Sequence, residues 1–229
     1  MLVVPRVPRT GSTSFQQLLK RKYRGLWSGC IASNLVDAAA MLNKEIARPS
    51  RKRVITAVSG HFPYGLHAHI AEPCTYITTS REPVSRVFSL WKLTYRHHLK
   101  PIDQWLEEDG FYAHNDVARY MAGADVAMPW VPDVFKVSVR DIPDANRGLL
   151  NAAKKNLETF ALVGVLERFS AFQSELETLI DATPSQMPWI HGHGDVPGPQ
   201  TITPRSAARI LELNAIDAEL HEWIRGIAP

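Results

Sequence analysis

The sequence predicts an α/β protein with a mostly parallel central sheet flanked by helices, because short apolar runs alternate with segments of helical periodicity. The apolar runs are rich in β-branched residues, which is typical of buried parallel strands. The chain of 229 residues contains no internal repeat and no low-complexity linker. Its length suits one α/β domain, so we predict a single domain over residues 1–229.

The hydrophobic pattern assigns the elements in order. The predicted strands are Leu2–Val7, Gly25–Cys30, Arg53–Ser59, Thr75–Thr79, Val134–Val139 and Ala161–Leu166. The predicted helices are Thr13–Tyr23, Asn34–Ile46, Pro83–His98, Pro101–Glu107, Asn115–Met121, Ala145–Thr159, Ala171–Asp181 and Pro204–Arg225. The last is predicted as one helix from a regular apolar stripe of Ile210, Leu213, Ile216, Leu220, Trp223 and Ile227. Residues 184 to 204, with five prolines and three glycines, are predicted to be a loop.

Composition excludes several classes of protein. The chain is 45% apolar and 21% charged, as in ordinary soluble proteins. No run approaches the roughly 20 apolar residues of a membrane helix, and the first residues do not resemble a secretory signal, so we expect a cytoplasmic protein without an integral membrane segment. A net charge of +3 argues against a nucleic-acid partner. The two cysteines, Cys30 and Cys74, are expected to be free thiols.

The first strand runs into a segment, Pro8–Ser14, that reads Pro-Arg-Thr-Gly-Ser-Thr-Ser and begins a helix. Glycine allows the backbone to approach a ligand closely, and hydroxyls beside the N–H groups of a helix start form an anion site. The same letters also suit an ordinary Ser/Thr helix cap. They do not match the Gly-x-x-x-x-Gly-Lys-[Ser/Thr] loop of nucleoside triphosphate enzymes. The candidate phosphate-binding residues are Arg9, Thr10, Gly11, Ser12, Thr13 and Ser14.

A second strand-to-helix junction follows Thr75–Thr79. Arg81 ends the strand region, and Pro83 suits the first turn of the next helix. Helical spacing places Ser89 on the polar stripe that Arg81 precedes. Both junctions should lie at the carboxyl edge of the sheet, where open α/β sheets bind ligands. A capped helix with a solvated polar face is the alternative interpretation.

Together the two junctions resemble the paired phosphate-binding signatures of the sulfotransferase family. These are a Pro-Lys-x-Gly-[Ser/Thr]-[Ser/Thr]-[Ser/Thr]-like loop and an Arg-[Asp/Glu]-Pro-x-x-Arg-x-x-Ser helix start. The sequence is most similar to the carbohydrate branch that includes the uronosyl 2-O-sulfotransferases and small bacterial relatives. The stretches Asn156–Phe169 and Leu213–Leu220 also look like that branch.

The resemblance implies a P-loop-like nucleotide-binding architecture and the co-substrate 3′-phosphoadenosine 5′-phosphosulfate, without a metal. The segment from Arg9 to Ser14 would hold the 5′-phosphosulfate, and Arg81 with Ser89 the 3′-phosphate. The family usually has lysine where this chain has Arg9, and the two residues are not interchangeable. Arginine keeps the positive charge but does not give up a proton, so its catalytic role here would be electrostatic.

Transfer to an acceptor hydroxyl requires a base, and His61 is the candidate. It follows the strand Arg53–Ser59, Gly60 would let the chain turn there, and the Gly-His pair matches the segment that carries the base in the resembled branch. Other histidines occur at short spacing, His67 with His69 and His191 with His193, but we expect no metal site.

The sequence therefore predicts a sulfotransferase whose acceptor is a hydroxyl, on a carbohydrate if the branch resemblance holds. Two alternatives remain open. A small nucleotide-dependent kinase shares the strand–loop–helix phosphate site but would require magnesium ligands. A nucleotide-binding module without catalysis is the other, because of the arginine at position 9.

Overall fold

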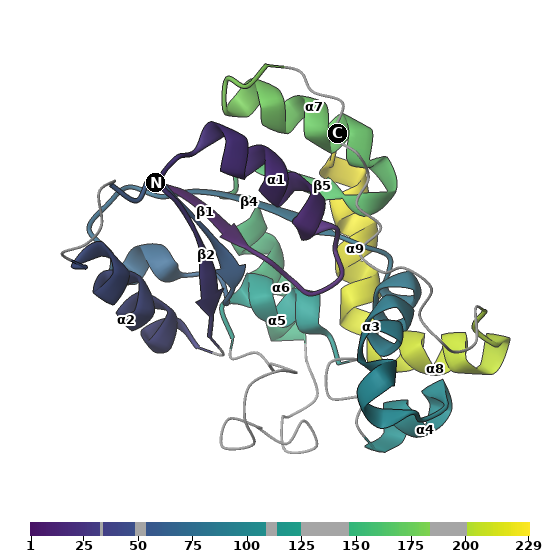
Figure 1. The fold of residues 1–229 in the computed structure, drawn as a ribbon. Helices are drawn as coiled ribbons and strands as arrows, with labels where there is room; N and C mark the ends of the chain where they lie inside the picture. Colours follow the sequence, from purple (N-terminus) through teal and green to yellow (C-terminus); the bar gives the residue numbers. More distant parts are fainter. Residues whose placement is uncertain (33, 49–53, 109–113, 125–146, 184–200) are drawn as a thin grey trace.

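A computed structural model of the protein describes all residues except 33, 49–53, 109–113, 125–146 and 184–200. In the described residues, five parallel strands form one sheet in the order β2-β3-β1-β4-β5. The strands are β1 (Leu2–Pro5), β2 (Leu26–Ile31), β3 (Ala57–His61), β4 (Thr75–Ser80) and β5 (Leu162–Val165). The predicted α/β fold with a parallel sheet flanked by helices is confirmed (Figure 1).

Successive residues of a strand point to opposite faces of the sheet, and in these strands the residues on both faces are apolar. Helices therefore cover both faces. On one face, Leu2, Val4 and Ile77 pack with residues of α1 (Ser12–Lys22) and α7 (Phe169–Leu179). On the other, Val3 and Val58 pack with α2 (Leu35–Ile46). That second face continues over β5, which is covered by α5 (Asp116–Ala122), α6 (Arg147–Leu157) and α9 (Ala215–Ile227).

A separate group of helices extends beyond the sheet (Figure 1). It consists of α3 (Pro83–His98), α4 (Ile102–Glu108) and α8 (Pro204–Leu213). Trp91, Trp105 and Ile210 are buried where these helices meet. Short 3₁₀ turns, η1 (Leu66–His69) and η4 (Leu166–Arg168), complete the described elements. None of the described helices is long and apolar enough to cross a membrane.

Four of the predicted segments differ from the described elements or lie outside the described residues. The strand predicted at Arg53–Ser59 begins later and ends at His61, as β3. The strand predicted at Val134–Val139 lies outside the described residues, as does most of the predicted loop at 184–204. The single helix predicted at Pro204–Arg225 is wrong, because the chain forms two helices that meet at Asn214.

The break at Asn214 has a physical cause. Its buried side-chain amide donates to the Ile210 carbonyl at 2.9 Å, and its Oδ1 accepts from the Asn115 backbone N–H at 3.1 Å. The apolar stripe therefore does not face one surface: Ile210 packs against α3, whereas Leu220 packs over the sheet. A periodic apolar pattern cannot reveal such a break, because the break depends on the hydrogen bonds that one polar residue makes in the folded protein.

A buried polar hub joins α3, α5 and α9. Arg86 of α3 is fully buried, and its Nη1 lies 3.2 Å from Asp116 Oδ2 while its Nη2 lies 3.6 Å from Asp217 Oδ2. Asp217 in turn accepts the backbone N–H groups of Val117 and Ala118, and so caps α5. The hub fixes α3 against the rest of the domain, and α3 carries Ser89.

Candidate functional site

The strand order creates a switch point between β1 and β4. The chain leaves β1 toward β2 on one side of the sheet, and leaves β4 toward β5 on the other side. In open α/β sheets the crevice at such a point, beyond the carboxyl ends of the strands, is where ligands bind. The two predicted junctions begin at these two neighbouring strands, as expected from the sequence.

The first junction is a tight turn into α1. Gly11 has a φ of +84° and is the N-cap of the helix, so no side chain caps the first turn there. Arg9 also has a positive φ, +72°, which is uncommon for a residue with a side chain. A strained conformation of this kind is often retained where it aims a side chain at a ligand.

The strained turn directs Arg9 to the second junction. The Nε of Arg9 donates to Ser89 Oγ at 2.8 Å, and Arg81 Nη1 donates to the Arg9 carbonyl at 3.3 Å. Arg9, Arg81 and Ser89 therefore lie together, although Ser89 is 80 residues from Arg9 along the chain. Glu82 caps α3 by accepting the N–H groups of Val84 and Ser85, so the ordinary helix-cap interpretation of this junction also holds.

The remaining residues of the first junction have different positions. Thr10 is buried, and its hydroxyl donates to the Val7 carbonyl at 3.0 Å, so this side chain supports the turn from inside. Ser12 and Ser14 are also buried, whereas Thr13 is exposed. Any contact of Thr10 with a ligand would therefore come from its backbone.

The guanidinium groups of Arg9 and Arg81 lie close together and half-buried, and they make the site electropositive. Burial and the nearby charge of Arg81 lower the pKa of Arg9 to about 10, so both groups remain charged at neutral pH. Burial also lowers the pKa of Arg81, and the carboxylates of Glu167 and Glu82 oppose that shift. Glu167 is held in place by the Glu82 backbone N–H at 2.9 Å. The site thus attracts anions, and two neighbouring carboxylates weaken that attraction.

His61 is the last residue of β3 and lies beside the first junction. Because Gly60 pairs with Pro5, His61 stands next to Arg6, and its Nδ1 lies 2.7 Å from the Arg6 carbonyl oxygen. A carbonyl can only accept, so Nδ1 carries the proton and Nε2 carries the lone pair. Burial and the charge of Arg6 lower the pKa of His61 to about 4. The imidazole is therefore neutral at pH 7, which is the protonation state a base requires.

The reason predicted for Gly60 is wrong. It lies inside β3 rather than in a turn, and a Cβ there would lie 2.3 Å from the Cys30 carbonyl oxygen. Glycine is required because strands β2 and β3 approach closely at this position. Cys30 is buried and Cys74 partly buried, and both are free thiols as expected.

Sequence reasoning missed Arg6 as a member of this site. Its Nη1 donates to Gln16 Oε1 at 3.4 Å, while its buried Nε has no hydrogen-bond partner among the described residues. The sequence did contain a sign of this. Arg6 directly follows a buried central strand, and a charged side chain at such a position loses its hydration unless it enters a polar site.

The turn at Gly11 allows a first test. A Cβ at this position would lie 2.1 Å from Leu166 Cδ1, and the positive φ penalises any side chain. We expect Gly11→Ala to lower the free energy of unfolding by about 1–2 kcal/mol from the backbone alone, as measured by denaturant unfolding. Leu166→Ala removes the clash, so a loss that persists when the double variant is compared with Leu166→Ala alone identifies the backbone conformation as the cause. Full stability of Gly11→Ala itself would contradict the assigned turn.

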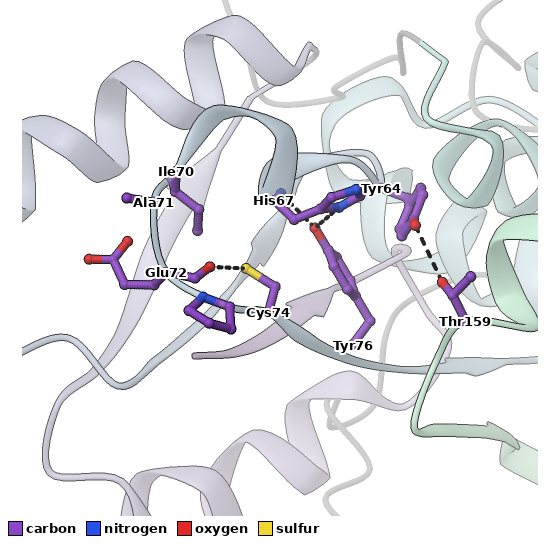
Figure 2. A pocket seen from close by; sticks show the side chains of 9 residues that line it. Tyr64, His67, Ile70, Ala71, Glu72, Cys74, Tyr76 and Thr159 are labelled. Carbon is purple, nitrogen blue, oxygen red and sulfur yellow. Dashed lines mark hydrogen bonds between the residues drawn. The ribbon is translucent and has the colours of Figure 1, made fainter.

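A pocket of about 440 Å³ lies elsewhere, near the start of β4. Figure 2 shows Tyr64 directed toward Thr159 and His67 toward Tyr76, with hydrogen bonds of 3.3 Å and 3.1 Å. It shares no residue with the two junctions. Among the described residues no group of three or more His, Cys, Asp or Glu side chains could hold a metal, and His191 and His193 lie outside them.

Comparison with known proteins gives no family: no protein-family model matches the chain, and no curated protein matches it significantly.

Proposed function

We propose that the chain is a sulfotransferase that moves a sulfuryl group from 3′-phosphoadenosine 5′-phosphosulfate to an acceptor hydroxyl, with a carbohydrate as the acceptor class. The observation that carries the proposal is the 2.8 Å contact from Arg9 Nε to Ser89 Oγ. It brings the two halves of the sulfotransferase-like signature to one point at the switch point of the sheet. An isolated helix cap at either junction would not require the other.

The sulfuryl donor carries negative charge on its 5′-phosphosulfate and on its 3′-phosphate. The site has a positively charged side chain available for each. In the proposal, Arg9 and the first-turn N–H groups of α1 hold the 5′-phosphosulfate in a P-loop-like manner, since Gly11 leaves that turn without a side-chain cap. Arg81 and Ser89 hold the 3′-phosphate. The co-substrate supplies an activated sulfuryl group, and the protein supplies charge, orientation and a base.

The proposed reaction is an in-line displacement at sulfur. A new O–S bond forms from the acceptor oxygen while the S–O bond to the bridging phosphate oxygen breaks, and that oxygen keeps the electron pair. His61 Nε2 takes the hydroxyl proton, and Arg9 with Ser12 stabilises the charge on the leaving oxygen. Because Arg9 stays protonated, its contribution is electrostatic.

The environment of His61 sets its strength as a base. Its low pKa, about 4, keeps it neutral, but the same shift makes it a weak proton acceptor. We expect the acid limb of kcat/KM to fall near pH 4, because this profile reports groups of the free enzyme.

Binding of adenosine 3′,5′-bisphosphate tests the nucleotide site. We expect Arg81→Ala to weaken binding by about 1.5–3 kcal/mol in calorimetry, the range for a hydrogen bond to a charged group. Arg21→Ala, at an exposed arginine of α1, is the matched control and should bind like the parent protein. Equal affinity of the Arg81→Ala variant would show that the second junction does not hold the nucleotide.

Transfer itself is tested with sulfur-labelled donor and three acceptor classes, namely sugars, phenols and lipids. Label on a sugar hydroxyl supports the proposal, and label on another class changes the acceptor but keeps the reaction. Bisphosphate binding without transfer to any acceptor would favour a non-catalytic module. Magnesium-dependent phosphate transfer from a nucleoside triphosphate would replace the proposal with a kinase.

A further inference from the structure

Both chain neighbours of Arg81 are anchored by one pair of side chains, an imidazole and a carboxylate. Ser80 ends β4, and its Oγ lies 3.0 Å from Nδ1 of His221 in α9. Glu82 donates its backbone N–H to Oε1 of Glu167 at 2.9 Å. The other carboxylate oxygen of Glu167, Oε2, lies 3.7 Å from Nε2 of His221. Arg81 therefore stands between two residues that are held by the same pair.

The strand register explains how Glu167 reaches Glu82. Ser80 pairs with Val165 in the parallel ladder of β4 and β5, so Glu167 is level with Glu82 just beyond the ends of both strands. The chain turns into η4 after Val165, and a side-chain carboxylate instead of a strand carbonyl accepts the Glu82 N–H. The segment that carries Arg81 is thus anchored past the end of β4, up to the start of α3.

Helix α9 brings His221 to the end of β4. Asp217, one helical turn before His221, forms an ion pair with Arg86 in the buried hub. Side chains at this spacing lie on the same face of a helix, and both Asp217 and His221 are buried. The hub therefore fixes the turn of α9 from which His221 reaches Ser80.

The direction of the hydrogen bonds follows from the chemistry of the pair. Burial lowers the pKa of His221, so the imidazole is neutral at pH 7. Because a carboxylate only accepts, Nε2 carries the proton that faces Glu167, and Nδ1 accepts the hydroxyl proton of Ser80. Serine, histidine and a carboxylate also occur together in hydrolases, but Ser80 is only 1% exposed, so a substrate does not reach its hydroxyl. The three groups hold the backbone on either side of Arg81.

We infer that His221 and Glu167 are positioning residues that hold Arg81 in the orientation in which it binds an anion, and that they set the preference for a nucleotide with a 3′-phosphate. The Nη1 of Arg81 already donates to the Arg9 carbonyl at 3.3 Å, inside the candidate site. Because both neighbours of Arg81 are anchored, less conformational freedom is lost when the anion binds. The role of the 3′-phosphate rests on the proposed function, whereas the anchoring of Arg81 does not.

Calorimetry with two probes measures this preference. The ratio of the dissociation constants of adenosine 5′-monophosphate and adenosine 3′,5′-bisphosphate isolates the contribution of the 3′-phosphate. The constant for the monophosphate alone reports general damage to the site. In Glu167→Ala we expect the ratio to fall about 2- to 10-fold, the equivalent of one hydrogen bond, although a negative charge that acts on Arg81 has been removed. Glu167→Gln keeps an oxygen for the Glu82 N–H, and its ratio should equal or exceed that of the parent protein.

The comparison of these two variants separates positioning from charge. If Glu167 acted only through its charge, both variants would raise the ratio, so an equal rise in both would overturn the inference. An equal fall in both would also overturn it, because Glu167→Gln retains the oxygen that accepts from Glu82. Glu222→Ala is the matched control, since it removes an exposed carboxylate of α9 whose ion-pair partner is Arg225. Its ratio should be that of the parent protein.

Ser80→Ala tests the contact of the pair with β4, and its small change in volume should leave the fold intact. The ratio should fall here too, because His221 loses its hydrogen bond to the strand. In the nucleotide-free variant, amide hydrogen exchange at Glu82 should be faster than in the parent protein, although Glu82 and its acceptor Glu167 are both still present. Unchanged exchange at Glu82 would show that the two contacts are independent and would overturn the anchoring.

The two proposals fail in different ways. If the parent protein binds the bisphosphate no more tightly than the monophosphate, the proposed function fails, and exchange at Glu82 still decides the anchoring of Arg81. If the parent protein prefers the bisphosphate and the preference persists in Glu167→Ala and Ser80→Ala, the nucleotide site stands and the inference is wrong. Thermal unfolding shows which variants fold, and Ser80→Ala with Glu167→Gln decides the inference if Glu167→Ala does not.

Discussion

Replacing His61 with alanine is expected to lower turnover by about 10²–10⁴-fold, the usual contribution of a general base. The physical reason is that the neutral imidazole presents its lone pair at Nε2, since Nδ1 is bound to the Arg6 carbonyl. Bisphosphate affinity should stay unchanged, because the proposed function gives the nucleotide contacts to Arg9, Arg81 and Ser89. Steady-state kinetics on the acceptor found in the labelled-donor screen, with calorimetry in parallel, give both quantities.

His69→Ala is the matched control for this variant, because it removes an exposed histidine eight positions along the chain. It should leave turnover near that of the parent protein. If His61→Ala also retains near-full turnover, another group is the base and the assignment is wrong. If the His61→Ala variant loses nucleotide binding as well, His61 supports the structure of the nucleotide site.

Replacing Arg86 with methionine is expected to lower the free energy of unfolding by about 3–5 kcal/mol, the usual cost of removing one partner of a buried ion pair. Arg86 is fully buried and lies within 3.2 Å of Asp116 and 3.6 Å of Asp217. Its loss leaves two buried carboxylates without their cation. Denaturant unfolding of the parent and the variant, analysed with a common m-value, measures the difference.

The pH dependence of this loss has a defined sign. Burial already raises the pKa of Asp116 to about 7, and that of Asp217 is raised as well. Without Arg86 both shifts increase, so the folded state binds more protons than the unfolded state as pH rises from about 4 upward. Stability then falls with rising pH, and the deficit of the Arg86→Met variant should be larger at about pH 8 than at about pH 5.

Two further variants keep the test decisive if Arg86→Met does not fold. Adding Asp116→Asn removes one uncompensated charge and should recover part of the stability. Arg21→Met, at an exposed position, should cost little. A loss in Arg86→Met no greater than that of Arg21→Met would contradict the structural role of the hub.

Local sequence patterns predicted the elements well where the contacts that define an element are made between residues close together in the sequence. Pro83 at a helix start and the helix through His98 are as predicted, and Asn34 caps α2 where the sequence places the start of that helix. The boundaries of β3 and the break at Asn214 differ from the prediction. Both depend on partners that are distant in the sequence, Cys30 in one case and Asn115 in the other.

The turn at Pro8–Ser14 and the residues Arg81, Ser89 and His61 could be named from the sequence, because glycine, hydroxyl and arginine have distinctive uses at strand-to-helix junctions. Only the tertiary structure decided which of them meet. It joined Arg9 to Ser89, turned the Thr10 hydroxyl inward, and added Arg6 beside His61. Periodicity and motif spacing describe neighbours along the chain, whereas strand order and burial set the distance and the charge between residues that are far apart in it.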